Sequence, residues 1–365
     1  MQVPLFKIQN DTSDVAEVAK VIRSGEYWAT GKQINEFEAA IANYIGTNYA
    51  VIFNSGTSAL QCELIAHGVG VGDEVIAPAF TFISTANTVK IVGAKPIFAD
   101  IEKDTCGLDV QSVEERITQR TKAIILVHYA GCPAKHTKNI ARLAQDKGLI
   151  LVEDNAESFG ASLNGSKTGT FGDSAMLSFC QNKIITTGEG GAVVTNDEKI
   201  YAKLKLLVSH GRIGNDNYKE LGYNFRMPTM NACLGRSQLR RVERLIELRI
   251  ARAKYYDKRL SEEKRVEVYK TPFGYKNVYQ MYPLKISGEA VARDKLVKHL
   301  TKNGIGTRIC FEPLYKTEYY KSLGHHDSLP TTEEVASKIL TLPMFPDLSF
   351  EQIDYVVNHI KEGIK

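Results

Sequence analysis

The sequence predicts an α/β fold, in which a large domain built on a mostly parallel β-sheet is followed by a smaller α+β domain. Strand-like and helix-like segments alternate along residues 49–195, the order expected of parallel strands joined by crossover helices. Residues 123–128 form a continuous apolar run, typical of a strand covered on both faces. The length of 365 residues is sufficient for two domains.

The large domain, predicted to cover residues 1–240, is expected to begin with two helices, at 12–24 and 36–44. The strands that follow are expected at 49–53, 74–77, 95–99, 123–128, 149–154, 175–179 and 191–195, and the further helices at 59–67, 85–92, 140–147 and 200–207. Glycine-containing turns separate several of these segments, which supports their assignment as distinct elements.

A long helix at about 229–262 is predicted to lead into the second domain, which covers residues 241–365. That domain is expected to contain strands near 266–270, 279–286 and 307–311 and helices near 291–302, 333–339 and 350–362. Its strands and helices lack the regular alternation of the first domain, so an α+β unit is predicted.

Composition and charge exclude several classes of protein. The 46 basic and 42 acidic side chains give a net charge of +4, which provides no reason to expect nucleic acid or a membrane as partner. The six cysteines form no CxxC pair and no cluster with histidine, so no metal site is predicted. The N-terminus lacks the regions of a signal peptide, and no apolar run approaches about 20 residues. We therefore expect a cytoplasmic protein with reduced thiols.

Residues 178–191, SFCQNKIITTGEGG, place a single lysine, Lys183, between two strands that are predicted to be buried. Burial disfavours the charged form of an amine and makes it a better nucleophile, which is the property that a Schiff-base lysine needs. The alternative is a lysine with a structural role. The residues around Lys183 leave both interpretations open.

Three further features lie where an α/β sheet binds ligands. Residues 54–58, NSGTS, form a turn between a strand and a helix, which is a phosphate-binding geometry; the alternative is a helix capped by Ser55 or Thr57. Asp154 ends a strand at the edge where ligands bind, or else caps the next helix. Phe82 follows another strand and is either a core residue or a stacking surface.

Several motifs occur together in the order and at the spacing of one family. They are Ser55-Gly-Thr-Ser-Ala-Leu60, Pro78-Ala-Phe-Thr-Phe82, Gly93-Ala-Lys-Pro96, Glu153-Asp154, Ser178-Phe179, Lys183, Gly188-Glu-Gly-Gly191, Gly222-Tyr-Asn-Phe-Arg226 and Gly304-Ile-Gly-Thr-Arg308. Over essentially its whole length the chain resembles the DegT/DnrJ/EryC1/StrS aminotransferases, pyridoxal-phosphate enzymes that aminate keto groups of nucleotide-linked sugars. The resemblance implies fold type I, with a seven-stranded sheet domain and a smaller C-terminal domain, and pyridoxal 5′-phosphate as cofactor.

The resemblance also implies roles for individual residues. Lys183 matches the catalytic lysine that forms a Schiff base with the cofactor. The implied cofactor contacts are Gly56, Thr57 and Ser178 at the phosphate, Asp154 at the pyridine nitrogen, Phe82 on the ring, and Glu157 near the 3′ oxygen, where glutamine is frequent in the family. Asn224 matches an asparagine that reaches the cofactor phosphate of a partner subunit, which implies a homodimer with shared active sites.

The sequence around Lys183 is most similar to perosamine-synthase-type members, which act in deoxysugar and O-antigen or polysaccharide biosynthesis. The implied reaction transfers an amino group from L-glutamate to C4 of a nucleotide-linked 4-keto-6-deoxy hexose. His210, Arg226 and Tyr315 are the expected substrate contacts, and Tyr315 stands where the family often has histidine. Two alternatives remain open: a nucleotide-sugar 3-aminotransferase, and a non-catalytic PLP-binding regulatory member of the family.

Overall fold

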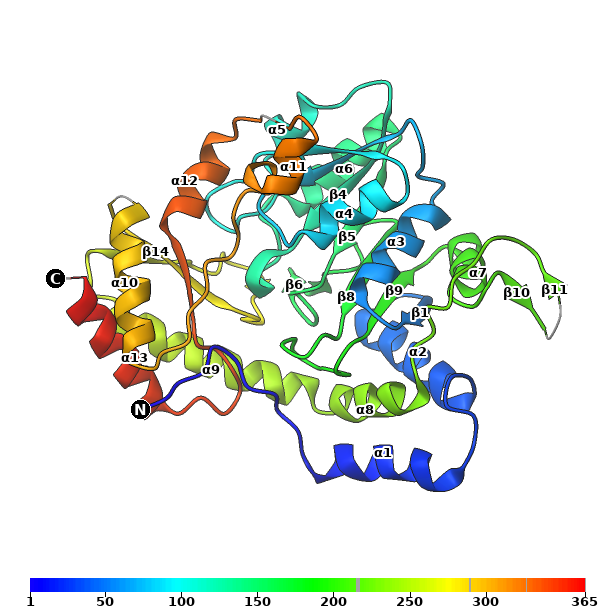
Figure 1. Cartoon of the computed structure of the whole chain (residues 1–365), viewed down its shortest axis with the longest axis horizontal. Helices are drawn as coiled ribbons and strands as arrows, with labels where there is room; N and C mark the ends of the chain where they lie inside the picture. The colour runs from blue at the N-terminus through cyan, green and yellow to red at the C-terminus, as the bar shows by residue number, and fades with distance from the viewer. Residues whose placement is uncertain (215–216, 289, 326, 365) are drawn as a thin grey trace.

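The computed structural model describes residues 1–214, 217–288, 290–325 and 327–364. Its centre is a seven-stranded sheet with the strand order β1–β9–β8–β5–β4–β2–β3 (Figure 1). The strands are β1 (Tyr49–Phe53), β2 (Glu74–Pro78), β3 (Lys95–Ala99), β4 (Thr121–Val127), β5 (Ile150–Asp154), β8 (Ser174–Ser178) and β9 (Gly191–Thr195). Strand β9 runs antiparallel to both of its neighbours, and the other adjacent pairs are parallel. The predicted α/β fold with a mostly parallel, seven-stranded sheet is confirmed.

Alternate residues of the strands pack against two separate layers of helices. In β4, Ala123 and Ile125 belong to the apolar cluster that includes α3 (Gly56–Ala66), α4 (Ser84–Ile91) and α7 (Glu198–Leu207). Ile124 and Leu126 face the other way, towards α5 (Val110–Glu114) and α6 (Thr137–Lys147). On that second face, α2 (Lys32–Ile45) and α8 (Thr229–Leu239) cover the β1–β9–β8 side of the sheet. Because both faces are covered, the strands read as continuous apolar runs in the sequence.

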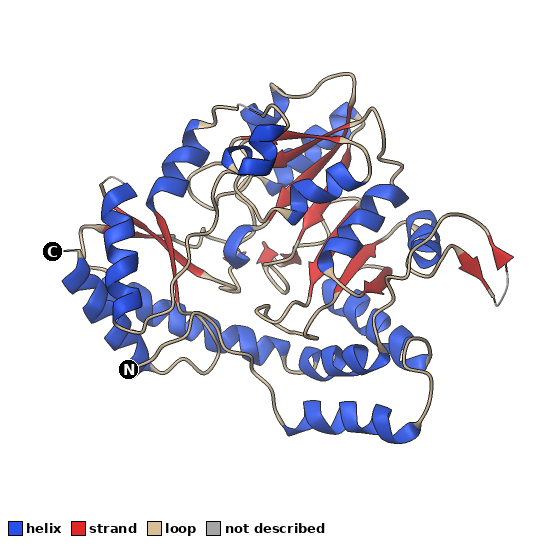
Figure 2. Cartoon of the chain, viewed as in Figure 1, coloured by secondary structure: helices blue, strands red, loops and turns tan. Residues whose placement is uncertain are grey.

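The C-terminal part of the chain forms its own core around an antiparallel sheet of β12 (Val266–Val268), β14 (Tyr282–Ile286) and β15 (Ile339–Leu342). Helices α10 (Ala290–Lys302) and α13 (Phe350–Gly363) pack on it together with the end of α9 (Val242–Leu260). Figure 2 shows this smaller sheet and its helices beside the large one.

Two segments join the large core to the small one. Val3 lies in the apolar core of the C-terminal part and pairs with Ile305. The first residues of the chain therefore pack with its C-terminal part. Helix α9 supplies Leu245 to the large core and Tyr256 to the small core. The domain boundary after residue 240 therefore remains a prediction, since α9 belongs to both cores.

Two predicted elements are wrong. The helix expected at 229–262 is broken between α8 and α9, where the Arg241 backbone leaves the helical region (φ −118°, ψ 13°). The guanidinium of Arg241 forms an ion pair there with Asp14 of α1 (Thr12–Ser24). This contact between segments far apart in the sequence holds the chain in place where the helix breaks. The strand expected near 307–311 is irregular, and Arg308 forms only an isolated bridge with Thr341.

The remaining elements are short or peripheral. They are β6 (Ser162–Leu163), β7 (Ser166–Lys167), β10 (Arg212–Ile213), β11 (Asn217–Tyr218), β13 (Tyr275–Lys276), α11 (Glu318–Ser322), α12 (Pro330–Lys338) and two 3₁₀ turns at Tyr129–Gly131 and Leu314–Lys316. In the described ranges, no helix combines the length and the apolar character that a membrane span requires.

Candidate active site

A cavity of about 450 Å³ lies at the carboxyl ends of the parallel strands, a size typical of small-molecule sites. Its walls come from the loop after β2, the end of β5, the loop after β8, the first turn of α3 and residues 308–311. The cavity brings together all the residues predicted to bind the cofactor within one subunit: Gly56, Thr57, Phe82, Asp154, Glu157, Ser178 and Lys183.

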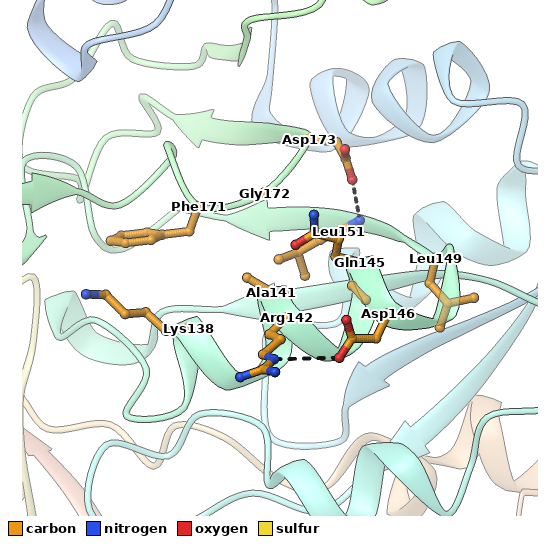
Figure 3. A pocket seen from close by; sticks show the side chains of 11 residues that line it. Lys138, Ala141, Arg142, Gln145, Asp146, Leu149, Leu151, Phe171, Gly172 and Asp173 are labelled. Carbon is orange, nitrogen blue, oxygen red and sulfur yellow. Dashed lines mark hydrogen bonds and ion pairs between the residues drawn. The ribbon is translucent and has the colours of Figure 1, made fainter.

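A larger surface groove of about 720 Å³ lies at the opposite, amino ends of the strands (Figure 3). The Arg142 guanidinium on its wall lies 3.7 Å from the Asp146 carboxylate, and the Asp173 carboxylate accepts the Leu151 N–H at 2.8 Å. The Arg142, Asp146 and Asp173 side chains thus already have partners, and the lining of this groove includes none of the predicted site residues. The smaller cavity is therefore the candidate active site.

Lys183 is held in the loop between β8 and β9. Its backbone N–H donates to the Cys180 carbonyl at 3.0 Å, and the adjacent Asn182 carbonyl accepts the Gln280 side chain at 2.6 Å. Its ammonium nitrogen points at Glu157, 3.9 Å from a carboxylate oxygen, and only 14% of the side chain is exposed. Of the two interpretations left open by the sequence, a lysine enclosed in a cavity agrees with the catalytic one.

Asp154 lies at the end of β5 and is almost entirely buried. Its carboxylate accepts the Thr85 hydroxyl at 2.9 Å and the Ala156 N–H at 3.0 Å. Burial raises the pKa of Asp154, and these two hydrogen bonds and the charge of Lys183 oppose that rise. A cationic ring nitrogen bound against this carboxylate would stabilise its charged form further.

Glu157 is the second carboxyl group of the cavity. It accepts the Ala130 N–H at 2.8 Å and faces Lys183. Burial raises the pKa of Glu157, Lys183 opposes the rise, and the nearby charge of Asp154 adds to it. Two carboxyl groups and one amine in one small space have coupled protonation, so Glu157 readily holds a proton when Asp154 is charged.

The first turn of α3 forms the opposite wall. Ser55 caps the helix by accepting the Ser58 N–H, so the capping interpretation is correct for that group. The N–H groups of Gly56 and Thr57 belong to the first turn of the helix, where no carbonyl of the helix can accept them. They are therefore suited to bind a phosphate. A Cβ on Gly56 would lie 3.2 Å from Ser178 Cβ, so glycine is what allows the helix terminus to sit against Ser178.

The two aromatic residues after β2 have different environments. Phe80 is fully buried and packs on Tyr129, whereas Phe82 is 51% exposed and lines the cavity. The core interpretation is therefore wrong for Phe82. Its ring centroid lies 6.3 Å from that of Phe311, which comes from the C-terminal part of the chain. An exposed ring on the wall of a cavity is placed to stack on a flat ligand.

The structure gathers three other predicted residues on a surface loop, away from the cavity lining. His210 and Asn224 are exposed, and Asn224 pairs with Ser209 as an isolated bridge. The Arg226 guanidinium donates to the Ser209 hydroxyl at 3.1 Å. Asn215 and Asp216, which follow His210 in this loop, lie outside the described residues.

Tyr315 is not brought to the cavity. Its side chain is 3% exposed, packs with Phe98 and Tyr320, and donates its hydroxyl to Glu333 at 2.7 Å. These contacts give Tyr315 a structural role in this subunit, because the hydroxyl that was expected to face the sugar already donates to the partly exposed Glu333.

Sequence reasoning missed several residues of the cavity. Thr85 donates to Asp154 and also contacts the Thr81 hydroxyl at 3.0 Å. Because the Thr85 proton goes to Asp154, Thr81 is the donor in that second bond. Arg308 and Phe311 line the cavity from the C-terminal part of the chain. The sequence held two signals for these residues. One is the pair of threonines at helical spacing just after a strand, and the other is the arginine of the Gly304–Arg308 motif.

The cavity residues fit pyridoxal phosphate. Asp154 suits a pyridine nitrogen, and Lys183 suits an aldehyde. The N-terminus of α3 together with Ser178 suits a phosphate. All of these residues line the same cavity. The close approach that Gly56 permits leaves backbone N–H groups, rather than a side chain, facing the anion site. Exposed Phe82 provides a surface for the ring.

Known proteins are similar to this chain over nearly its full length. A GDP-perosamine synthase of Caulobacter vibrioides is 38% identical over 333 residues, covering 90% of this chain and 89% of that protein. A pleiotropic regulatory protein of Geobacillus stearothermophilus is 36% identical over 372 residues, covering 99% and 98% of the two chains.

Solved structures and a family model agree with these relatives. Spr1654 of Streptococcus pneumoniae in its PLP-form has a TM-score of 0.95 and 27% identity, covering 100% of this chain and 99% of that one. The model of the DegT/DnrJ/EryC1/StrS aminotransferase family matches residues 9–361. The chain belongs to the DegT/DnrJ/EryC1/StrS aminotransferase family, and its cofactor is pyridoxal phosphate.

Proposed function

We propose that this protein transfers the amino group of L-glutamate to C4 of a nucleotide-linked 4-keto-6-deoxy hexose. The observation that carries the proposal is the placement of Lys183 and Asp154 in one cavity at the carboxyl edge of the sheet. The similarity to a GDP-perosamine synthase supports the choice of substrate. All six cysteines are free thiols, which agrees with the cytoplasmic location that we propose.

Pyridoxal phosphate, when bound, supplies an electron sink for the bond changes at the amine-bearing carbon. The residues of this chain hold and complete it. Asp154, kept in place by Thr85 and Ala156, favours a protonated ring nitrogen. Lys183 carries a proton to and from the reacting carbon as general acid and base, and the enclosing cavity excludes water from that proton.

Arg308 is the cationic residue that we assign to the amino donor. Its side chain is exposed at the cavity wall, and its charge acts on Glu157. A guanidinium binds carboxylates through two parallel hydrogen bonds, so Arg308 suits a carboxylate of glutamate. The same site then accepts the ketosugar after the donor's keto acid has left.

We also propose a homodimer in which each subunit completes the other's site. His210, Asn224 and Arg226 lie together on one surface loop, outside the cavity lining of their own subunit. Contact with cofactor or sugar would come through a second copy, in a symmetric arrangement. Mixing inactive Lys183→Ala with inactive Asn224→Ala should restore about a quarter of wild-type activity, since half of the dimers are hybrids with one intact site. Complete lack of complementation would contradict shared sites.

A regulatory, non-catalytic role is the second candidate, because one relative is named a pleiotropic regulatory protein. The geometry favours catalysis instead. A protein that only binds the cofactor has no use for an enclosed lysine facing a carboxyl group, or for a threonine that donates to the ring-nitrogen carboxylate.

The proposal is tested by incubating the protein with glutamate and GDP-linked 4-keto-6-deoxymannose and detecting the aminated sugar nucleotide by mass spectrometry. Parallel reactions with dTDP- and UDP-linked 4-ketosugars, and with a 3-ketosugar nucleotide, test the nucleotide and the position. Lys183→Ala is the control for each reaction. Amination of the 3-ketosugar alone would overturn the C4 assignment, and activity with none of them would overturn the function.

A further inference from the structure

Three metal-ligating side chains meet at the edge of the small domain, away from the active site. His299 belongs to α10, and His359 and Glu362 belong to α13, the two helices that lie together near the C-terminus (Figure 1). One ligand atom of each side chain lies within 4.8 Å of the others. His359 Nδ1 lies 2.9 Å, and His299 Nε2 3.9 Å, from the same carboxylate oxygen of Glu362.

Both histidines leave a ring nitrogen without a hydrogen-bond partner within the described chain. His299 Nε2 and His359 Nδ1 are each shielded from solvent. His359 Nδ1 is close to Glu362, but the two groups are not aligned for a hydrogen bond. Buried polar atoms in folded proteins almost always have a partner, so two such nitrogens beside one carboxylate indicate a bound species between them.

The surrounding packing holds the cluster in place. A Cβ on Gly363 would lie 2.9 Å from His299 Cδ2, so the glycine is what allows the end of α13 to approach His299. The Tyr355 ring packs edge-on against His359, with centroids 4.5 Å apart. These contacts restrict both imidazoles before any ligand binds, which reduces the entropy cost of binding.

We propose that His299, His359 and Glu362 bind a divalent transition-metal ion of the zinc class. Two imidazoles and one carboxylate, with water as the fourth ligand, are a normal tetrahedral zinc set. Bond lengths of about 2.0–2.2 Å place tetrahedral ligand atoms about 3.4 Å apart, and the observed separations of 2.9 and 3.9 Å lie on either side of that value. Calcium and magnesium prefer oxygen ligands and fit this set poorly.

The ion would join the last turns of α10 and α13. His299 and Glu362 both lie in the final turn of their helix, where the partial negative charge of the helix dipole favours a cation. Glu362 is half exposed, which leaves an entry path from solvent. The ion would tie together the two helices that cover the small sheet and so stabilise them, although its water-bound fourth position differs from the closed, four-ligand sites of zinc fingers.

Linear spacing concealed this site. His359 and Glu362 are three residues apart on one helix, but His299 lies on another helix, 60 residues earlier in the chain. The prediction that the chain binds no metal rested on the absence of a Cys/His cluster in the sequence, and only the packing of α10 on α13 brings the third ligand into place.

The test is calorimetric titration of Zn²⁺ into the full-length, chelator-treated, PLP-loaded protein. We expect one ion per chain. His299→Gln and His359→Gln should each weaken binding by more than about 10-fold, because even changes in the second shell of metal sites cost about 10–100-fold. His136→Gln, which changes a histidine outside the cluster, should bind as wild type. The melting temperature and the visible spectrum of the bound cofactor check that each variant is folded.

Titration with Co²⁺ distinguishes metal binding at this cluster from metal binding at any of the six cysteines. A site of two imidazoles and a carboxylate gives the visible bands of four-coordinate cobalt without a thiolate-to-metal charge-transfer band. Zn²⁺ should also raise the melting temperature of wild type and of His136→Gln but not of the two cluster variants. No binding of Zn²⁺, a thiolate band, or equal affinity in the cluster variants would each overturn the proposal.

Discussion

The ammonium nitrogen of Lys183 lies 3.9 Å from a carboxylate oxygen of Glu157 inside the candidate active site. The same carboxyl group accepts the Ala130 N–H, so its position is fixed. Burial raises the pKa of Glu157, the nearby Asp154 charge raises it further, and Lys183 opposes both. Glu157 therefore sits between an anionic neighbour and a cationic one, and its protonation responds to both.

Glu157→Gln should extend activity to higher pH. Above its raised pKa, Glu157 becomes a second anion beside Asp154, and the wild type loses the proton that Glu157 can donate to an oxygen of the cofactor. Glutamine keeps a donor at every pH. The alkaline limb of kcat/KM should therefore move to higher pH in the variant. A uniform loss of activity, with both limbs unmoved, would show that the carboxylate form is the working one.

Thr85→Val should slow the half-reaction with glutamate by about 10-fold, equivalent to about 1.4 kcal/mol, which is close to the lower end of the usual value of a hydrogen bond to a charged group. The change removes a donor to Asp154 and raises the pKa of that carboxyl, which weakens its hold on a protonated ring nitrogen. Thr88→Val is the matched control, because Thr88 lies on the same helix and donates to the Thr85 carbonyl instead. Stopped-flow absorbance compares the two, and equal rates in both would contradict the role of Thr85.

Gly56→Ala should weaken pyridoxal phosphate binding by about 10-fold or more. The added methyl group would lie 3.2 Å from Ser178 Cβ and would push the α3 terminus away from the phosphate position. Gly70→Ala is the control, since a Cβ there would lie 3.9 Å from its nearest neighbour. Fluorescence titration of the cofactor into both apoproteins gives the comparison, and unchanged affinity in Gly56→Ala would place the phosphate elsewhere.

Glu63→Gln should remove a pH-dependent loss of stability. Glu63 of α3 is fully buried, its carboxyl oxygens have no well-formed hydrogen bond among the described residues, and burial raises its pKa well above the ordinary value. Because the folded state then holds the proton more tightly than the unfolded state, the free energy of unfolding falls as pH rises from the unfolded pKa towards the folded one.

At about pH 8 the Glu63→Gln variant should therefore be more stable than wild type by about 1–3 kcal/mol, and at about pH 4 the two should agree more closely. Urea denaturation at both pH values measures the difference. Glu247→Gln, on an exposed side chain, should follow wild type at both pH values. A constant difference between wild type and Glu63→Gln across pH would contradict a protonated Glu63.

The sequence allowed the fold and most of the one-subunit site to be predicted, because both follow from local patterns. Apolar runs of five to seven residues mark strands such as β4. Asp154 ends β5 and Lys183 lies in the loop after β8, and a parallel sheet brings the carboxyl ends of these strands to one edge. The position of Phe82 could not be decided this way, because the local sequence pattern of an aromatic residue after a strand is the same whether its ring lines a cavity or fills a core.

The failures come from contacts between distant segments. The break at Arg241 depends on Asp14, the burial of Tyr315 depends on Phe98 and Glu333, and Val3 packs in the small core through Ile305. Strand β15 was hidden because its first residue, Ile339, continues the helical pattern of α12. Each of these is decided by tertiary packing that overrides a local preference.

The central claim is that Lys183 is the catalytic amine, and the absorbance of the bound cofactor on addition of glutamate tests it most directly. Purified wild type should show a violet-region band that glutamate bleaches as the amino group is taken up. Lys183→Ala, reconstituted with pyridoxal phosphate and melting near the wild-type temperature, should react at least about 100-fold more slowly, in line with the loss of a general acid and base. Bleaching of Lys183→Ala at the wild-type rate would contradict the account.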